Sequence, residues 1–272
     1  MKNSEIEDKK ALIKYLNKDI YGQDDAVKSL AYYVNILNSE PVCTKKIDKF
    51  TILFAGESGT GKTLMAKKCC SYLNHESLNN ESNNIVFLPI VATEFSKEGF
   101  VGNSIAEFNL KIKKYKNDGK RLIIFIDEID KLILDNNSFK KGVTDELLSL
   151  INENYVILSG AFSNKDTKEI KELIKKSSLE FFTRIHDYVI FKNVDKLIVA
   201  ERLIKILSEK HPSINFESLK ELTSEVTSYR DITSMFYRID KILYDIDGEK
   251  PTKFNNELFL SSEKSKTKET LF

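Results

Sequence analysis

The sequence predicts a parallel α/β domain followed by a small all-helical domain. Up to about residue 192, short apolar runs alternate with stretches of helical apolar spacing, which is typical of parallel strands covered by helices. From Asn193 onward the strand-like runs stop and only helical spacing remains. A glycine-rich loop between the first strand and the helix after it indicates where the α/β domain would bind phosphate.

The chain before the first strand is expected to be helical. The first twenty residues are charged and carry a weak apolar stripe at helical spacing. Gly22 and Gln23 predict a turn, and Asp24 can cap the helix that follows. Apolar residues from Val27 to Leu37 recur at helical spacing, so this helix should bury one face.

Five strands are predicted from short apolar runs. They are expected at residues 50–55, 85–91, 122–126, 155–159 and 188–191. The run at 122–126 is continuously apolar, which suits a strand buried on both faces. Helices are predicted between strands at residues 64–70, 105–115 and 144–151. The predicted fold is therefore a parallel five-stranded sheet between two helical layers, an αβα sandwich.

The predicted domain boundaries are 1–192 for the large α/β domain, 193–250 for the small helical domain and 251–272 for a polar tail. Helical spacing at 196–208, 216–227 and 231–244 defines the small domain. The tail is rich in serine, lysine and glutamate, so we expect it to be disordered or loosely attached.

Composition excludes several classes of protein. With 41% hydrophobic residues among 272, the chain can bury a core, and 42 basic residues nearly balance 41 acidic ones. This balance argues against a protein that mainly coats nucleic acid. Cys43, Cys69 and Cys70 form no metal-binding pattern, and the three histidines are scattered. With neither a signal-peptide pattern nor a membrane-length apolar run, we expect a soluble, cytoplasmic protein without a membrane partner.

The glycine-rich loop has the residue types that nucleotide binding requires. It consists of Gly56, Glu57, Ser58, Gly59, Thr60, Gly61, Lys62 and Thr63. Its glycines let backbone N–H groups approach phosphate oxygens, and the following helix favours an anion at its N-terminus. Lys62 supplies charge to the outer phosphates and Thr63 a hydroxyl for Mg²⁺. A chance glycine loop is the alternative, but the strand before it and the helix after it make ATP binding the prediction.

Two acids directly after the most apolar strand indicate hydrolysis. Burying carboxylates at a sheet edge is costly, so Asp127 and Glu128 need a reason to be there. Asp127 can hold Mg²⁺, and Glu128 can orient and deprotonate the water that attacks the γ-phosphate. The alternative is a solvated acidic turn. Because the phosphate loop is present, we predict an ATP hydrolase.

These motifs resemble the Clp-type AAA+ ATPases, and the resemblance covers roughly residues 17–245. It implies the AAA+ module, with Ile20 and Tyr21 bordering the adenine. The segment 99–102 resembles the family's substrate-gripping pore loop, in which Phe100 and Val101 would contact an extended polypeptide. A buried turn with Phe100 in the core is the alternative.

Three further positions are carried over from the resemblance. Arg184 matches the arginine finger, which acts on ATP bound by a neighbouring subunit, and a surface salt bridge is the alternative. Arg230 lies where the second sensor arginine is expected, although it could simply begin a helix. The first sensor falls on either Ser159 or Asn164, and the sequence does not choose between them.

The chain also departs from the family pattern. Glu57 stands where many relatives have proline and Thr183 where they have asparagine, but neither change touches phosphate or metal. Little sequence precedes Ile20, and there is no Cys-rich zinc module or tripeptide resembling a peptidase-docking Ile-Gly-Phe. We therefore expect a stand-alone or specialised remodeller, without an N-terminal adaptor domain.

Three functional hypotheses follow. The first is a homo-oligomeric, hexameric ring that uses ATP and Mg²⁺ to unfold or remodel a protein substrate. The second is a helicase or clamp-loader type of ATPase acting on nucleic acid, which the balanced charge and the apolar segment 99–102 disfavour. The third is a slow, ATP-gated switch that holds a protein partner.

Overall fold

The computed structural model of the chain describes residues 2–38, 49–76, 85–96, 101–134, 141–163, 165–193, 195–217, 219 and 229–245. Its contacts divide the chain into two compact units, Met1–Lys192 and Asn193–Phe272. Each unit is described by itself below. The predicted tail at 251–272 and most of the predicted helix at 216–227 lie outside the described residues.

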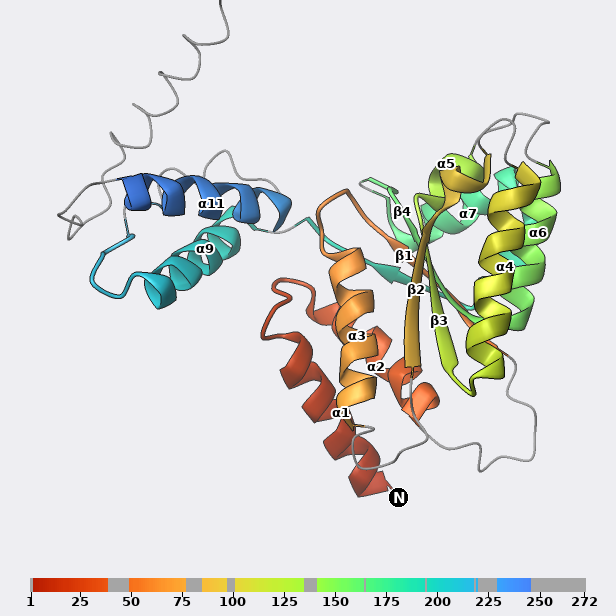
Figure 1. The fold of residues 1–272 in the computed structure, drawn as a ribbon, viewed down its shortest axis with the longest axis horizontal. Helices are drawn as coiled ribbons and strands as arrows, with labels where there is room; N and C mark the ends of the chain where they lie inside the picture. The colour runs from red at the N-terminus through yellow and green to blue at the C-terminus, as the bar shows by residue number, and fades with distance from the viewer. Residues whose placement is uncertain are drawn as a thin grey trace, which may run out of the picture. The chain divides into compact units, whose positions relative to one another are not determined.

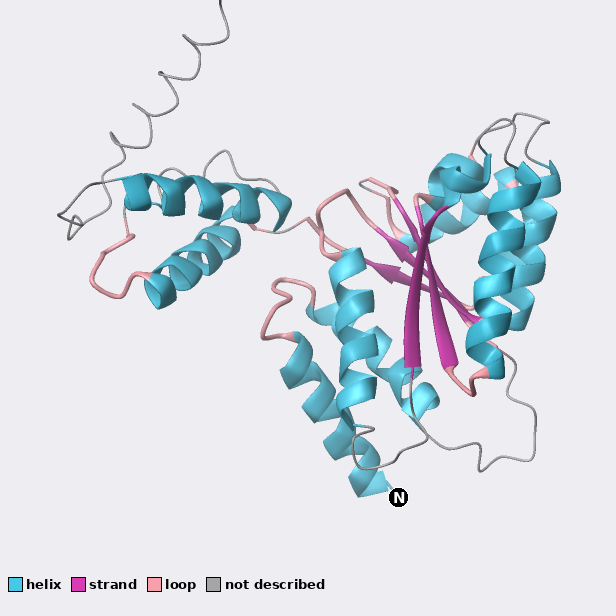
Figure 2. Ribbon diagram, viewed as in Figure 1, coloured by secondary structure: helices cyan, strands magenta, loops and turns pink. Residues whose placement is uncertain are grey.

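The first unit is built on a sheet of five parallel strands, as predicted (Figures 1 and 2). The strands are β1 (Thr51–Ala55), β2 (Ile85–Val91), β3 (Arg121–Asp127), β4 (Tyr155–Gly160) and β5 (Asp187–Ile190). Their order in the sheet is β2-β3-β4-β1-β5. This order places β4 between β1, which precedes the glycine-rich loop, and β3, which ends at Asp127. Both motifs therefore lie at the carboxyl ends of the strands, on one side of the sheet.

Helices cover both faces of the sheet (Figure 1). One layer contains α1 (Lys2–Leu16), α2 (Asp24–Asn38) and α3 (Lys62–Glu76). The other contains the short helix η2 (Ala92–Ser96) together with α4 (Val101–Asn117), α5 (Ile129–Ile133), α6 (Lys141–Glu153), α7 (Thr167–Ser177) and α8 (Leu179–Arg184). Alternate residues of β3 face opposite layers: Ile124 belongs to one buried apolar cluster, whereas Ile123 and Phe125 belong to the other. A continuously apolar strand is the expected consequence of this two-sided burial.

The helices of the second layer differ from the prediction at several places. Helix α4 begins at Val101 rather than at 105, and its first buried residue among those described is Phe108. Helices α7 and α8 were not predicted. In α7 only one stripe, which includes Ile170 and Ile174, is buried. Asp166 caps this helix, since its carboxylate accepts a hydrogen bond from the N–H of Glu169 at 2.8 Å.

The second unit contains two described helices of appreciable length, α9 (Lys196–Lys210) and α11 (Tyr229–Asp245). They share an apolar cluster that includes Leu207 and Ile239. Asp240 joins α11 to the end of α9, because its two carboxylate oxygens lie 2.6 Å from Lys210 Nζ and 2.8 Å from His211 Nε2. The hydrogen bond from Lys210 is the main cause that holds the pKa of Asp240 below its usual value. None of the described helices combines the length and apolarity needed to cross a bilayer.

Candidate nucleotide site

The glycine-rich loop connects β1 to α3, as its motif requires. Gly59 and Gly61 adopt φ angles of 80° and 97°, which are left-handed values that a residue with a Cβ atom disfavours. Inside the loop, the Thr60 hydroxyl donates a hydrogen bond of 2.8 Å to the carbonyl of Glu57. Helix α3 begins at Lys62, so its first N–H groups have no partner within the helix and are available to an anion.

Lys62 is held inside the loop. Its ammonium donates hydrogen bonds to the carbonyl oxygens of Gly56, at 2.7 Å, and Glu57, at 2.6 Å. The side chain is buried, and this burial lowers the pKa of Lys62, partly offset by the nearby charge of Asp127. A buried cation beside free N–H groups forms a strongly anion-attracting pocket, as a triphosphate site requires.

Thr63 and Asp127 lie together although 64 positions separate them in the sequence. The Thr63 hydroxyl donates a hydrogen bond of 3.3 Å to the Oδ2 atom of Asp127. A hydroxyl and a half-buried carboxylate are hard oxygen donors of the kind that Mg²⁺ prefers, and Mg²⁺ commonly takes few protein ligands beside phosphate oxygens. The two residues therefore fit a magnesium–nucleotide complex. The described residues contain no group of three or more histidine, cysteine or acidic side chains placed to hold a metal alone.

Glu128 has the only left-handed backbone among the described non-glycine residues, with φ 57° and ψ 32°. Such a conformation costs about 1 kcal/mol or more and often marks a functional position. Two contacts hold it: the Glu128 N–H donates to Asp127 Oδ1 at 2.9 Å, and Oε2 forms an ion pair with Lys131 Nζ at 2.8 Å. Hydrogen bonding to Glu128 is also the first cause that raises the pKa of Lys131.

The end of β4 is tied to the same acidic segment. Asp130 Oδ1 accepts a hydrogen bond of 3.0 Å from the N–H of Ala161, which follows β4. Ser159 lies within β4, is fully buried, and its hydroxyl has no hydrogen-bond partner in the structure. The other candidate for the first sensor, Asn164, lies outside the described residues. The choice between Ser159 and Asn164 therefore stays open.

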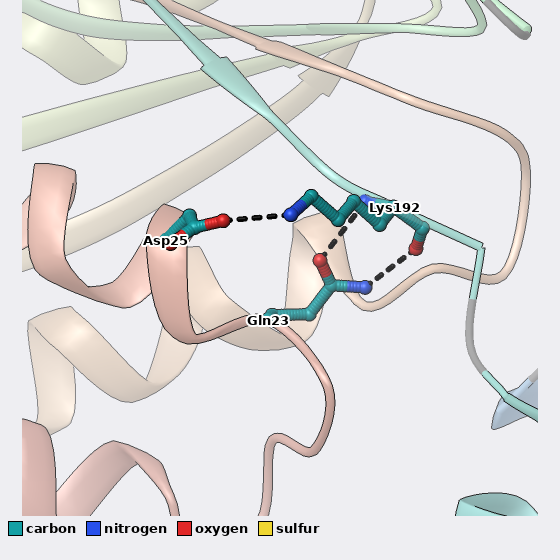
Figure 3. A network of polar contacts seen from close by, with 3 residues as sticks. All are labelled: Gln23, Asp25 and Lys192. Atoms are coloured by element: carbon teal, nitrogen blue, oxygen red, sulfur yellow. Dashed lines mark hydrogen bonds and ion pairs between the residues drawn. The ribbon is translucent and has the colours of Figure 1, made fainter.

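The segment before α2 contains a functional contact that the sequence did not reveal (Figure 3). Gln23, expected only to form a turn, is 3% exposed and binds both backbone groups of Lys192. Ile20 is buried, and the Tyr21 hydroxyl donates to the carbonyl of Lys18 at 2.6 Å. A cavity of about 310 Å³ adjoins this segment and is lined by Gly22, Gln23, Asp24, Asp25, Ala26, Lys28, Ile190 and Lys192. In the sequence, Gln23 is only an amide residue at the start of a well-defined helix. Such residues are too common to predict its contact with Lys192.

Arg184 lies near the amino ends of β1 and β5, whereas the phosphate loop follows the carboxyl end of β1. Arg184 ends α8, shortly before β5 begins at Asp187, and the His186 N–H donates to the carbonyl of Thr51, the first residue of β1. The phosphate loop follows the other end of β1, and a strand of five residues spans about 15 Å. Arg184 instead hydrogen-bonds Asn152 Oδ1 at 3.0 Å and the carbonyl of Glu180 at 2.9 Å. It is therefore not placed to contact the nucleotide held by its own loop.

Two other predicted positions are only partly described. Phe100 lies outside the described residues. Val101 is the first residue of α4, so the expectation that Val101 and Gly102 belong to a loop is wrong, and any loop in this place ends by residue 100. Arg230 lies in the first turn of α11, in the second unit, and its side chain is not among those described.

The start of the phosphate loop packs against the end of β5, which makes Gly56 sensitive to substitution. A Cβ atom at Gly56 would lie 2.5 Å from the carbonyl oxygen of Phe191 and 2.8 Å from its Cβ. Because one of these neighbours is backbone, we expect Gly56→Ala to lower the free energy of unfolding by about 1–3 kcal/mol, as overpacking does. Urea denaturation of the full chain measures this change.

Gly119→Ala provides the matched control for this substitution. Gly119 has a φ of 71° but no atom within 4 Å of an added Cβ, so its replacement introduces backbone strain without a clash. We expect a loss of about 1 kcal/mol there. An equal or smaller loss in Gly56→Ala would contradict the close packing of the loop against Phe191.

The fold and the arrangement of the site resemble those of AAA+ ATPases. Residues 52–175 match the family model described as "ATPase family associated with various cellular activities (AAA)". Two solved structures share the fold: the Thermotoga maritima RuvB Holliday junction branch migration motor and C. elegans PCH-2. RuvB has a TM-score of 0.57 at 18% identity and covers 90% of this chain and 69% of its own. PCH-2 has a TM-score of 0.58 at 16% identity, and the match covers 92% of this chain and 70% of PCH-2.

Within this class the chain is related to the Clp-type ATPases. It is 32% identical over 149 residues to the ATP-dependent Clp protease ATP-binding subunit ClpX of Borrelia duttonii, covering 50% of this chain and 32% of the relative. The protein of the same name from Bacteroides thetaiotaomicron is 29% identical over 144 residues, covering 49% and 32%. The chain thus matches about a third of the length of these relatives. The predicted resemblance to Clp-type AAA+ ATPases and the predicted class of enzyme, an ATP hydrolase, are confirmed.

Proposed function

We propose that the chain is a ring-forming ATPase that uses ATP hydrolysis to remodel protein substrates. The observation that carries the ring is the position of Arg184 near the amino ends of β1 and β5, away from its own phosphate loop. An arginine there can stabilise the transferred phosphoryl group only on another copy of the chain. Repeated head-to-tail contacts form a ring when the rotation between copies closes, and we propose a closed ring of six copies.

Within one copy, different residues bind the phosphates, hold Mg²⁺ and activate the attacking water. Lys62 and the N–H groups that begin α3 bind the phosphates, while Thr63 and Asp127 hold Mg²⁺. When bound, Mg²⁺ neutralises charge on the phosphate oxygens. Glu128, one residue beyond Asp127, orients the attacking water and accepts its proton. In this structure its carboxylate forms an ion pair with Lys131.

The remaining assignments are also part of the proposal. Ile20 and Tyr21 border the adenine, and the loop residues Glu57, Ser58 and Thr60 surround the phosphates together with the glycines. Arg230 senses the nucleotide from the second unit. Val101, the first residue of α4, contacts the substrate together with Phe100, which precedes it in the sequence. Support comes from the relatives, which bear the name of the ATP-binding subunit of an ATP-dependent protease.

The substrate class is tested by measuring ATP turnover with an unfolded protein and, separately, with single-stranded DNA. We expect the unfolded protein to raise turnover several-fold and the DNA to leave it unchanged. Phe100→Ala should abolish this stimulation, because an apolar contact that grips a polypeptide is lost, while basal turnover stays close to that of the wild-type chain.

Tyr237→Ala serves as the control for loss of an aromatic side chain, since Tyr237 is 66% exposed on α11. Stimulation by DNA alone would replace the proposed function with a nucleic-acid motor, the activity named for the structural neighbour RuvB. Nucleotide-dependent binding of protein without stimulated turnover would indicate an ATP-gated switch instead.

A further inference from the structure

Gln23 connects two segments that are distant in the sequence (Figure 3). Its Nε2 atom donates to the carbonyl of Lys192 at 2.7 Å, and its Oε1 atom accepts from the N–H of Lys192 at 3.0 Å. The same Nε2 donates to the carbonyl of Thr60, inside the phosphate loop, at 3.3 Å. One side chain thus bridges the phosphate loop and Lys192, the last residue of the first unit.

The bridge is protected from solvent and reinforced. Gln23 is 3% exposed and Thr60 is 4% exposed, so water does not compete effectively for the hydrogen bond between them, and the two bonds to Lys192 are partly buried. Gln23 holds the backbone of Lys192. The Lys192 ammonium also forms an ion pair of 2.7 Å with Asp25, which lies two residues after Gln23 (Figure 3). The preceding residue, Phe191, donates its N–H to the carbonyl of Ala55, directly before the loop. Lys192 is therefore fixed relative to the loop by several independent contacts.

The two ends of the bridge differ in strength. Both bonds to Lys192 are of ordinary length, whereas the bond to Thr60 is the longest of the three and therefore the most easily altered. Lys62 donates to the loop carbonyls of Gly56 and Glu57 in this structure. Phosphate oxygens would compete for the Lys62 ammonium, so a bound triphosphate would release the carbonyls of Gly56 and Glu57. The Thr60 hydroxyl also contacts the Glu57 carbonyl, which links this change to the residue that Gln23 contacts.

We propose that Gln23 is a positioning residue that transmits the state of the phosphate loop to the connection between the two units. The inference rests on the proposed function, since it requires the loop to bind a nucleotide. Ordering of the loop by phosphate fixes the Thr60 carbonyl, which fixes the Gln23 amide and, through it, the backbone of Lys192. Lys192 is the last residue of the first unit, so the state of the loop reaches the point where that unit ends.

The test uses hydrogen–deuterium exchange of the full chain, followed in a peptide covering residues 189–197. We expect a slowly hydrolysed ATP analogue to slow exchange in this peptide at least about threefold in the wild-type chain, because the Lys192 N–H is one of the bridged groups. In Gln23→Met, which keeps the length of the side chain but none of its hydrogen bonds, the analogue should still bind while exchange no longer responds to it. Turnover should fall about tenfold with KM within about twofold, as expected for lost positioning rather than lost binding.

Asp25→Asn is the matched control, since it weakens the ion pair with the Lys192 side chain but leaves the three bonds of Gln23. It should retain the nucleotide-dependent slowing. A response in Gln23→Met equal to that of the wild-type chain would overturn the inference. So would a wild-type chain that binds the analogue without any change in the peptide, and this result would leave the proposed function intact.

Failure of the wild-type chain to bind the analogue would overturn the proposed function and the inference with it. If Gln23→Met does not fold, as judged by circular dichroism, Gln23→Asn takes its place. That side chain is shorter by one methylene group and cannot span from Lys192 to Thr60. A purely structural role for Gln23 predicts that the shorter variant lowers stability but keeps the response to nucleotide, and this outcome would also overturn the inference.

Discussion

Glu128→Gln is expected to lower ATP turnover by about 10²–10⁴-fold while nucleotide affinity changes little. Glutamine has the same shape as glutamate but cannot accept the proton of the attacking water. It also lacks the charge that pairs with Lys131. The phosphate-binding groups, Lys62 and the start of α3, are untouched, so binding should persist. Phosphate release measures turnover, and titration with a fluorescent nucleotide measures affinity.

Glu172→Gln is the control for this substitution, because Glu172 is an exposed carboxylate on α7. It should behave like the wild-type chain in both measurements. Turnover in Glu128→Gln above about a tenth of the wild-type value would show that another group activates the water. Lost affinity in Glu128→Gln would instead indicate a role for Glu128 in binding.

Arg184→Ala is expected to reduce turnover by about 10³-fold or more, because the charge that develops on the transferred phosphoryl group loses its stabilisation. If Arg184 acts on a neighbouring copy, another copy of the chain with an intact Arg184 should restore the lost turnover. When equal amounts of Arg184→Ala and Glu128→Gln are mixed, about a quarter of the interfaces pair an intact Glu128 with an intact Arg184. Turnover in the mixture should therefore rise well above that of either variant alone.

The control for Arg184→Ala is Asn152→Ala. Asn152 accepts a hydrogen bond from Arg184, so its replacement removes that contact without removing the guanidinium. Most of the turnover should remain. Normal hydrolysis in Arg184→Ala would refute the assignment of the finger. Inactivity that mixing does not relieve would refute catalysis across an interface between copies.

The strands were predictable from the sequence because each is a short apolar run in contact with helices on both faces, and β2 was predicted with its observed limits. Their order in the sheet was not predictable, since local patterns carry no information about which strands are neighbours. Helix α7 escaped the prediction because only a narrow stripe of it is buried and its lysines and glutamates dominate the local composition. Its capping pair, Asp166 and Glu169, was a readable signal.

The candidate site was likewise predictable from the sequence only in part. Thr63 and Asp127 were both predicted to hold Mg²⁺, and the structure places them within hydrogen-bonding distance. Their motifs have local signatures because phosphate and metal binding demand particular residues in a short segment. Gln23 has no such signature, because its contact is with a backbone group 169 positions away. The roles of Phe100, Arg184 and Arg230 remain predictions.

The left-handed backbone conformation of Glu128 lowers the stability of the fold at the residue that we propose to be the general base. Glycine would relieve about 1 kcal/mol of strain at this position, but it would remove the carboxylate. Selection for stability alone would therefore drift towards an inactive chain. We therefore expect a glutamate in this conformation to be kept only where selection acts on hydrolysis.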